Sequence, residues 1–511
     1  MKKSNDSRVK NSIMNSIYGI GSYFIIYFIT FFSRRVFGLA LGKEFFGLNS
    51  LFNDIVSLLT VTELGLSTAI IFFLYKPMAE YDHEKVNAYL NFSKKLYRII
   101  GLIILALGSF ICLFLDKIAK TTIDINSARF YFMLFLMSTL VTYMYAYKKS
   151  ILYADQKNRI ISSAHTICKV IFELIQMALI FWTKNYVIYL VLLIISNFSE
   201  NLFCSLYVDK LYSEYLRDKK VKIDKAEESG IFYKFRNLLV QNISAYIVTT
   251  TDNIVISSFL SVVTAGIYSN YILLTNTLKT IFSQVFSAFT TSFGNLSVTS
   301  SSEKCQSVFE KAQFFAFCFS AITGIVYVCV IQPFIYMWMG KEFLFGVDVP
   351  FVLIYSYFVI NMNVPAISVQ NALGLHQHDK YVVVVQALFN IVFSITFVQL
   401  IGVKGVILAT ILSTLLFPTI SKPYVIYKYV FHTSVSSYIF EYLKYNLLYV
   451  VLLLGTFYVT SFIQLENIFV TFLLKGIVSL CIPLIIIILL YKKDERFLYY
   501  WNLFLKIFKR K

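Results

Sequence analysis

Two adjacent arginines, Arg34 and Arg35, end one long apolar run and are followed by another within a few residues. A full charge at membrane depth costs roughly 2.5–3.5 kcal/mol, so such a residue faces protein or water and is a functional candidate. The planar guanidinium matches phosphate oxygens and keeps its charge when desolvated. Neighbours on a helix point about 100° apart. We therefore expect one arginine to turn inward and bind phosphate while the other reaches the outer interface; a pair of interfacial anchors is the alternative.

A second cation, Lys279, lies in the middle of the apolar stretch ILLTNTLKTIFSQVFSAF. Asn276, Lys279 and Ser283 are spaced i, i+3 and i+7, so a helix places them on one face. A lysine facing lipid would be costly. We expect this polar stripe to line a water-filled cavity, with a buried structural pair as the alternative.

Three acids, Glu63, Glu200 and Asp252, also fall inside apolar runs. Acids at this depth are candidates for coupling transport to a cation, either a proton or sodium. For Asp252, a helix-capping role or a role between repeats fits the sequence equally well.

Lys169 and Glu173 are four residues apart and lie on the same helix face as His165. This spacing predicts a mutually neutralising pair in the polar lining of a cavity rather than a proton relay. We expect no metal site and no cofactor, because the seven cysteines form no CxxC motif and most lie in apolar runs.

These residues belong to a membrane protein. The 511-residue chain is 58% hydrophobic and 14% charged, and apolar runs of about 20 residues recur throughout it. We expect an all-α integral membrane protein with about 14 transmembrane helices. The predicted spans are 12–36, 48–75, 97–115, 128–147, 160–182, 186–208, 237–260, 264–290, 312–335, 348–373, 381–401, 404–428, 445–463 and 468–491.

Most of the 46 lysines and arginines fall on one side of this arrangement, which the positive-inside rule makes cytoplasmic. Both termini are then cytoplasmic, and the net charge of +18 is mainly a topology signal rather than a nucleic-acid surface. The basic, aromatic tail 492–511 is typical of an amphipathic helix on the inner membrane surface.

The two halves share a repeated pattern. Gly47 and Gly266, about 219 residues apart, each precede a long apolar run and a polar loop of similar composition. Six spans per half make this a parallel repeat, with two bundles facing each other across a central cavity. The predicted parts are a lobe at 1–210, a linker at 211–236, a lobe at 237–430, helices 13 and 14 at 431–491 and the tail.

Several motifs resemble the Wzx-type polysaccharide flippases of the multidrug/oligosaccharidyl-lipid/polysaccharide exporter superfamily. They are the arginine ending the first span, LGKEFFGL, ELGLSTA and LYKPMAEYD, together with DNIVISSFLSVVTAGIYS in the second half. The resemblance implies a bacterial inner-membrane protein that flips undecaprenyl-pyrophosphate-linked oligosaccharide repeat units for capsule or O-antigen assembly. It also implies alternating access of two lobes, with pyrophosphate bound by Arg34 or Arg35, and here we add Lys279 from the second half. Expected partners are membrane lipids, a polymerase and glycosyltransferases, and the expected state is a monomer.

Other functions fit the sequence less well. A lipid-linked peptidoglycan precursor flippase would share the pyrophosphate chemistry, and a cation-coupled multidrug exporter would share the fold. An enzyme such as a polysaccharide polymerase needs a substantial external loop or an acidic metal motif, and all predicted external loops are short. We therefore expect a transporter and not an enzyme.

Overall fold

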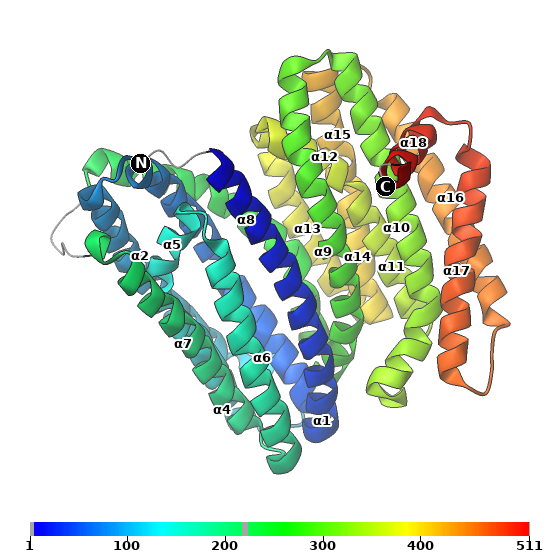
Figure 1. Cartoon of the computed structure of the whole chain (residues 1–511). Coiled ribbons are helices and arrows are strands. Elements are labelled where there is room, and N and C mark those ends of the chain that lie inside the picture. Colours follow the sequence, from blue (N-terminus) through cyan, green and yellow to red (C-terminus); the bar gives the residue numbers. More distant parts are fainter. Residues whose placement is uncertain (1–4, 217–222, 510–511) are drawn as a thin grey trace. The chain divides into compact units, whose positions relative to one another are not determined.

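The computed structural model describes residues 5–216 and 223–509, and every regular element in this part of the chain is helical. The chain forms two compact units, Met1–Gly266 and Ile267–Lys511 (Figure 1). The lobe boundaries expected from the sequence stay predictions, and part of the expected linker lies outside the described residues.

Unit 1 is built from long helices with short connections; α1 packs along α6 and α8, and α4 packs along α7. Its elements are α1 (Asn5–Glu80), α2 (His83–Leu113), α3 (Leu115–Ile118), α4 (Ile125–Tyr143), α5 (Ala146–Ala154), α6 (Asn158–Thr183), α7 (Tyr186–Leu211), η1 (Ser213–Leu216) and α8 (Lys225–Phe259). Helix α9 (Val262–Thr299) begins in unit 1 and continues into unit 2.

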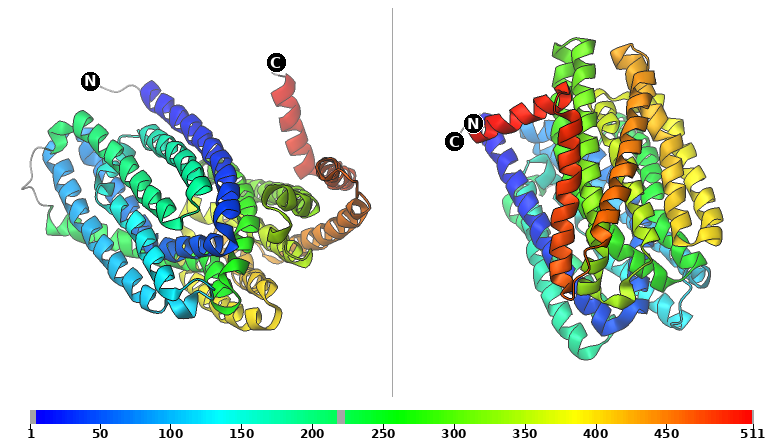
Figure 2. Two further views of the ribbon diagram at one scale, coloured as in Figure 1. Left: turned by 90° about the horizontal axis from the view of Figure 1, so that it is seen from below. Right: turned by 90° about the vertical axis from the view of Figure 1, so that its right-hand side faces the viewer.

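Unit 2 is arranged around α10, which packs against α11, α16 and α17. Its elements are α10 (Ser302–Met339), η2 (Lys341–Phe343), α11 (Asp348–Met362), α12 (Val364–Leu373), η3 (Leu375–His378), α13 (Lys380–Ile401), α14 (Val403–Leu416), α15 (Pro418–Ile426), η4 (Tyr427–Phe431), α16 (Ser436–Ser461), α17 (Ile468–Tyr491) and α18 (Glu495–Lys509). Figure 2 shows α16 and α17 side by side, with α18 turning away from the axis of α17.

Local chemistry explains where several helices start. Side-chain oxygens of Asp82, Asp124 and Asn185 accept hydrogen bonds from the first backbone N–H groups of α2, α4 and α7. These groups have no partner within their own helix, so a capping side chain satisfies them. Proline at the first turn marks the starts of α12 and α15, where its missing N–H costs nothing.

Helix α1 contains the first two predicted spans and bends between them. The bend is at Gly42, whose backbone (φ 82°, ψ 178°) is far from helical. Such a φ is accessible to glycine without steric cost. The bend turns the chain just after the arginine pair and so brings the following segment back toward it.

Two glycines allow α1 to approach the start of α9 closely. A Cβ added at Gly47 would overlap the backbone carbonyl of Val262, and one added at Gly266 would lie 2.8 Å from the Cα of Gly47. The two glycines that correspond in the predicted repeat therefore meet each other within unit 1.

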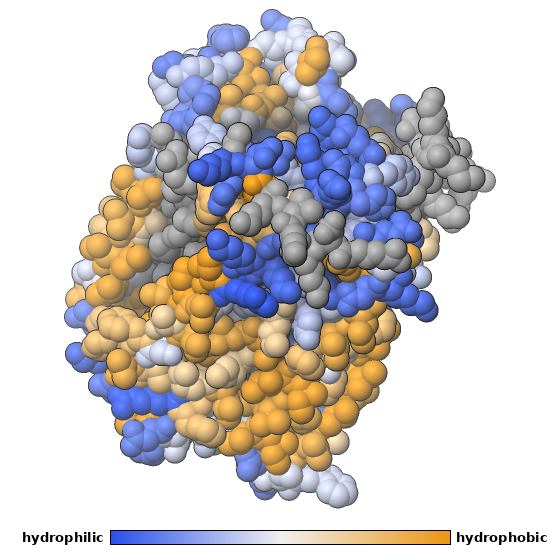
Figure 3. All heavy atoms as spheres, turned by 90° about the vertical axis from the view of Figure 1, so that its left-hand side faces the viewer, coloured by the Kyte–Doolittle hydropathy of each residue, from blue (hydrophilic) through white to orange (hydrophobic). Residues whose placement is uncertain are grey.

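The exterior suits a lipid environment. Large apolar side chains such as Phe24, Leu102 and Trp182 are more than half exposed. Figure 3 shows one face on which hydrophobic side chains form a broad belt, with hydrophilic residues gathered mainly toward one end. Within the described residues, 11 helical stretches are long and apolar enough to cross a membrane, so this is a multi-pass membrane protein. The expected number of 14 crossings stays a prediction.

Candidate functional site

A polar cavity of about 280 Å³ lies inside unit 1, between α1, α4, α6 and α7. Charged residues in its lining are Arg34, Lys169 and Glu173, which give it one excess positive charge. The uncharged polar residues in the lining are Thr30, Ser33, Asn49, Ser50, Asn53 and Tyr189, and the apolar ones are Phe37, Phe46, Phe135 and Leu193.

The adjacent arginines have different environments. Arg34 lines the cavity, whereas Arg35 is exposed on another face of α1. The guanidinium carbon of Arg34 lies 4.7 Å from the ring centre of Phe46, and Tyr189 and Asp54 interact with the arginine electrostatically. Phe46 comes after the bend at Gly42, so that bend supplies the aromatic face on which the guanidinium rests.

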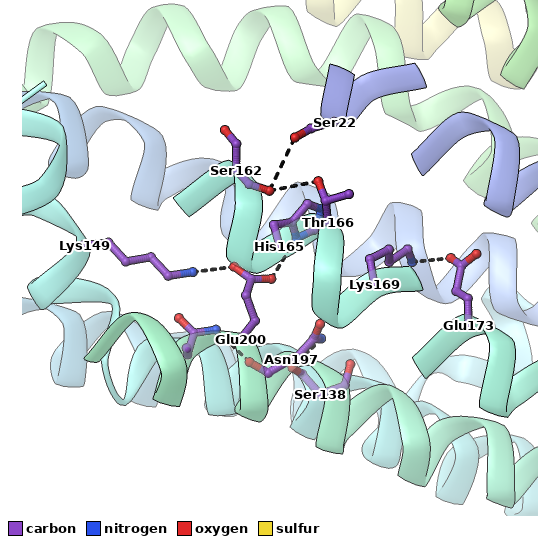
Figure 4. A network of polar contacts seen from close by, with 11 residues as sticks. Ser22, Ser138, Lys149, Ser162, His165, Thr166, Lys169, Glu173, Asn197 and Glu200 are labelled. Carbon is purple, nitrogen blue, oxygen red and sulfur yellow. Dashed lines mark hydrogen bonds and ion pairs between the residues drawn. The ribbon is translucent and has the colours of Figure 1, made fainter. Parts of the chain in front are cut away.

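Lys169 and Glu173 form an ion pair along one face of α6. Their Nζ and Oε1 atoms are 2.7 Å apart (Figure 4). The Thr30 hydroxyl lies 3.5 Å from the same carboxylate oxygen. Glu173 is only 5% exposed, and its other oxygen, Oε2, has no hydrogen-bond partner among the described residues. The pair therefore places one cation and one buried acceptor in the same cavity as Arg34.

Aromatic rings form one wall of this cavity. Phe37 packs edge-on against Tyr189 with ring centres 4.9 Å apart, and Tyr186 stacks on Tyr189 at 5.8 Å. Tyr186 also donates a hydrogen bond to Asn49, one of the lining amides, at 3.2 Å. Flat rings beside amide and hydroxyl groups can contact both the apolar faces and the hydroxyls of a sugar.

His165 on α6 and Glu200 on α7 belong to a second polar network, which is separate from the cavity lining. Glu200 accepts from Lys149 Nζ at 2.7 Å and is 2.7 Å from His165 Nδ1 (Figure 4). Lys149 is on α5, so the network ties α5, α6 and α7 together. Glu200 is thus held in a cationic setting, and its proposed role in ion coupling stays a prediction.

The other two candidate acids are partly buried in unit 1, Glu63 on α1 and Asp252 on α8. A fourth acid, Asp54, is not among the candidates that the sequence suggests. Its Oδ2 accepts a 2.6 Å hydrogen bond from Asn253, which joins α1 to α8. Asn49 and Asn53, spaced i and i+4 in the same NSLFND stretch, are the signal that could have directed attention there.

The second-half candidates lie on α9 in unit 2. The helix keeps Asn276, Lys279 and Ser283 on one face; Asn276 and Ser283 are exposed, and Lys279 is partly buried. Convergence of Lys279 with Arg34 on one ligand stays a prediction.

Comparisons with known proteins agree with this architecture. A family model described as "Polysaccharide biosynthesis protein" matches residues 12–293. Among solved structures, a lipid II flippase MurJ in an inward closed conformation is similar, with 16% identity, a TM-score of 0.68 and coverage of 94% of this chain and 99% of that one.

Transporters of the multidrug resistance MATE family are also similar. An inward-facing one has 14% identity and a TM-score of 0.64, and the match covers 78% of this chain and 94% of that one. A mutant of the Vibrio cholerae transporter VcmN has 10% identity and a TM-score of 0.54, with coverage of 84% and 100%. No curated protein sequence matches. These likenesses establish the fold, and the family model establishes the family: the chain belongs to the polysaccharide biosynthesis protein family.

Proposed function

We propose that this protein flips polyprenyl-pyrophosphate-linked oligosaccharide repeat units from the inner to the outer leaflet for surface polysaccharide assembly. The observation that carries the proposal is the unit 1 cavity, where Arg34 stands beside aromatic and amide groups. A guanidinium suits a pyrophosphate, and the polar and aromatic lining suits sugars. The family to which the chain belongs supports the same pathway.

Transport rather than catalysis is the proposed activity, powered by an ion gradient, the membrane potential or consumption of product outside. Asp252, Glu63 and Glu200 are the candidates for coupling to a cation. The proposed setting is the bacterial inner membrane with both termini cytoplasmic. The proposed partners are the polymerase and glycosyltransferases of the pathway, and the proposed oligomeric state is a monomer.

A lipid-linked peptidoglycan precursor is the second candidate substrate, since the chain is similar in fold to a lipid II flippase. Both substrates carry a lipid pyrophosphate, so the same arginine would serve. A multidrug exporter of cationic compounds is disfavoured, because the excess positive charge in the cavity lining repels cations.

The test is a deletion strain of the source organism. We expect loss of surface polysaccharide and accumulation of its lipid-linked repeat unit, both reversed by the intact gene but not by Arg34→Ala at equal protein level. Accumulation of lipid-linked peptidoglycan precursor instead would identify the second substrate. Normal polysaccharide and normal lipid-linked pools in the deletion strain would contradict the proposal.

A further inference from the structure

A second cavity, of about 330 Å³, lies inside unit 2 between α10, η4, α16 and α18. Phe309, Tyr427 and Tyr438 form an aromatic wall, with ring centres between 6.1 and 6.2 Å apart in all three pairs. None of the residues discussed above for substrate binding lines this cavity. Its volume is that of a small-ligand site.

Two buried polar groups of this lining can accept a hydrogen bond from a bound molecule. Gln313 is 5% exposed, and its Nε2 donates to the Met362 carbonyl at 2.9 Å, which fixes the orientation of the amide. That orientation leaves Gln313 Oε1 buried with no hydrogen-bond partner among the described residues. The hydroxyl of Tyr438, whose side chain is 4% exposed, also has no hydrogen-bond partner among the described residues. Buried polar atoms in folded proteins usually have a partner, so both groups are available to a molecule that enters the cavity.

The charge of the lining also favours a cation. It contains two carboxylates, Glu310 and Glu441, and one guanidinium, Arg496. Arg496 donates to Glu441 Oε2 at 2.8 Å and also pairs with Asp494 outside the lining, so its one positive charge is shared between two acids. Glu310 accepts from the neutral amide of Gln306 at 2.9 Å, and no ion pair of Glu310 occurs among the described residues. One negative charge is left over, beside rings whose faces attract cations.

We propose that this cavity binds a primary alkylammonium group, R–NH₃⁺. Three N–H donors and one positive charge match Glu310, Gln313 Oε1, the Tyr438 hydroxyl and the aromatic wall together. A quaternary ammonium has the charge but no N–H, and it would leave the amide oxygen unsatisfied. A metal ion fits less well, because no group of three metal-ligating side chains occurs among the described residues. The alkylammonium could be a free amine or the ethanolamine headgroup of a membrane lipid.

The first test measures ethanolamine binding to the delipidated, full-length protein in detergent by titration calorimetry. We expect saturable binding of ethanolamine and at least tenfold weaker binding of choline, which has the same charge without N–H. Glu310→Gln should weaken ethanolamine binding at least tenfold, and Tyr438→Phe should weaken it about threefold. The matched controls are Glu303→Gln, an exposed glutamate of α10, and Tyr442→Phe, one turn further along α16 and outside the lining; both should bind as the parent does.

A second measurement separates the two sources of the amine and guards against misfolded variants. Ethanolamine is titrated into nanodiscs containing phosphatidylethanolamine and into others containing phosphatidylcholine, with unfolding temperature recorded for every variant. Weaker ethanolamine binding only in the phosphatidylethanolamine discs identifies the lipid headgroup as the ligand. Equal affinity for ethanolamine in both kinds of disc identifies a free amine as the ligand. Absence of ethanolamine binding in detergent, equal affinity for choline, or unchanged binding in folded Glu310→Gln and Tyr438→Phe would each overturn the proposal.

Discussion

Neighbouring residues of the same type acquire different roles from their helix faces. Arg34 lies in the unit 1 cavity against Phe46, and Arg35 is exposed on the lipid or solvent side. Sequence alone predicts that the two diverge, because they are about 100° apart on the helix. It does not predict which one turns inward, since that depends on the bend at Gly42 and on the faces that α6 and α7 present.

Replacement of Arg34 should impair transport far more than replacement of Arg35. Arg34→Ala removes a charged hydrogen-bonding partner of the proposed pyrophosphate, which should cost about 1.5–3 kcal/mol, or about tenfold or more in affinity. Arg34→Lys should restore only part of this, because the bidentate fork is lost. Surface polysaccharide measured in the complemented deletion strain gives the readout, with Arg35→Ala as the matched control. Equal activity of the Arg34 and Arg35 alanine variants would contradict the assignment.

A single substitution in the Lys169–Glu173 pair should destabilise the protein more than substitution of both residues. Lys169→Met leaves the buried Glu173 carboxylate without its cation, and breaking such a pair typically costs about 3–5 kcal/mol. In the double variant Lys169→Met/Glu173→Leu no uncompensated charge remains, so most of the loss should be recovered. Unfolding of the purified variants in detergent measures this, and a double variant as unstable as the summed singles would refute it.

The helices themselves were largely predictable, whereas their polar ends were not. Hydropathy detects the part of a helix that lies in hydrocarbon, so the predicted span 97–115 misses the first turns of α2, which begins at His83. The predicted span 348–373 is a pair, α11 and α12, and the break before Pro365 follows from proline chemistry. The site was only partly predictable for a similar reason, since Asn49 and Asn53 are ordinary polar residues until packing encloses them.

Gly47→Ala should destabilise unit 1 by about 1–3 kcal/mol, because the new methyl group would meet the backbone of Val262, which cannot move aside as a side chain can. Gly455→Ala on α16 is the matched control, since a Cβ there has open space around it. That control should be neutral or stabilising by about 0.5–1 kcal/mol, as alanine favours a helix. Comparison of the two unfolding temperatures decides, and equal behaviour would argue against a tight contact at Gly47.

The attachment of α18 to α16 should depend on pH only in the acidic range. Arg496 ties α18 to α16 by donating to Glu441 at 2.8 Å. It also donates to both oxygens of Asp494, at 2.9 and 2.8 Å, which orients the guanidinium and holds the pKa of Asp494 below its ordinary value. Because the pKa of Asp494 is lower in the folded protein, the ionised carboxylate stabilises the fold at pH values above its unfolded-state pKa of about 3.9. This stabilisation is lost as the pH falls through the folded-state pKa. Attachment should therefore be constant from about pH 8 to 5 and weaken below about pH 4.

Fluorescence anisotropy of a dye on Leu505→Cys reports that attachment. Asp494→Asn is the matched variant: it should show lower anisotropy at neutral pH and a smaller change in acid. A transition in the parent protein near pH 6–7 would contradict the assignment to Asp494.

For the whole chain, the charge distribution predicts which side each connection occupies. In a variant without native cysteines, Lys220→Cys and Leu505→Cys should be labelled by an impermeant thiol reagent only after the cells are opened. Lys184→Cys, between α6 and α7, should be labelled in intact cells and serves as the matched control. The opposite pattern would invert the orientation, and labelling of 220 and 505 from opposite sides would contradict the even number of crossings.

The meeting of Gly47 and Gly266 has a consequence for how such a chain can change over generations. If the halves arose by duplication, each copy contributes the same small residue to one shared contact. A bulkier residue in either copy closes the space that both use, so no compensating change at the other glycine can reopen it. The halves are free to diverge in their loops and cavities, but at this contact both must keep a glycine.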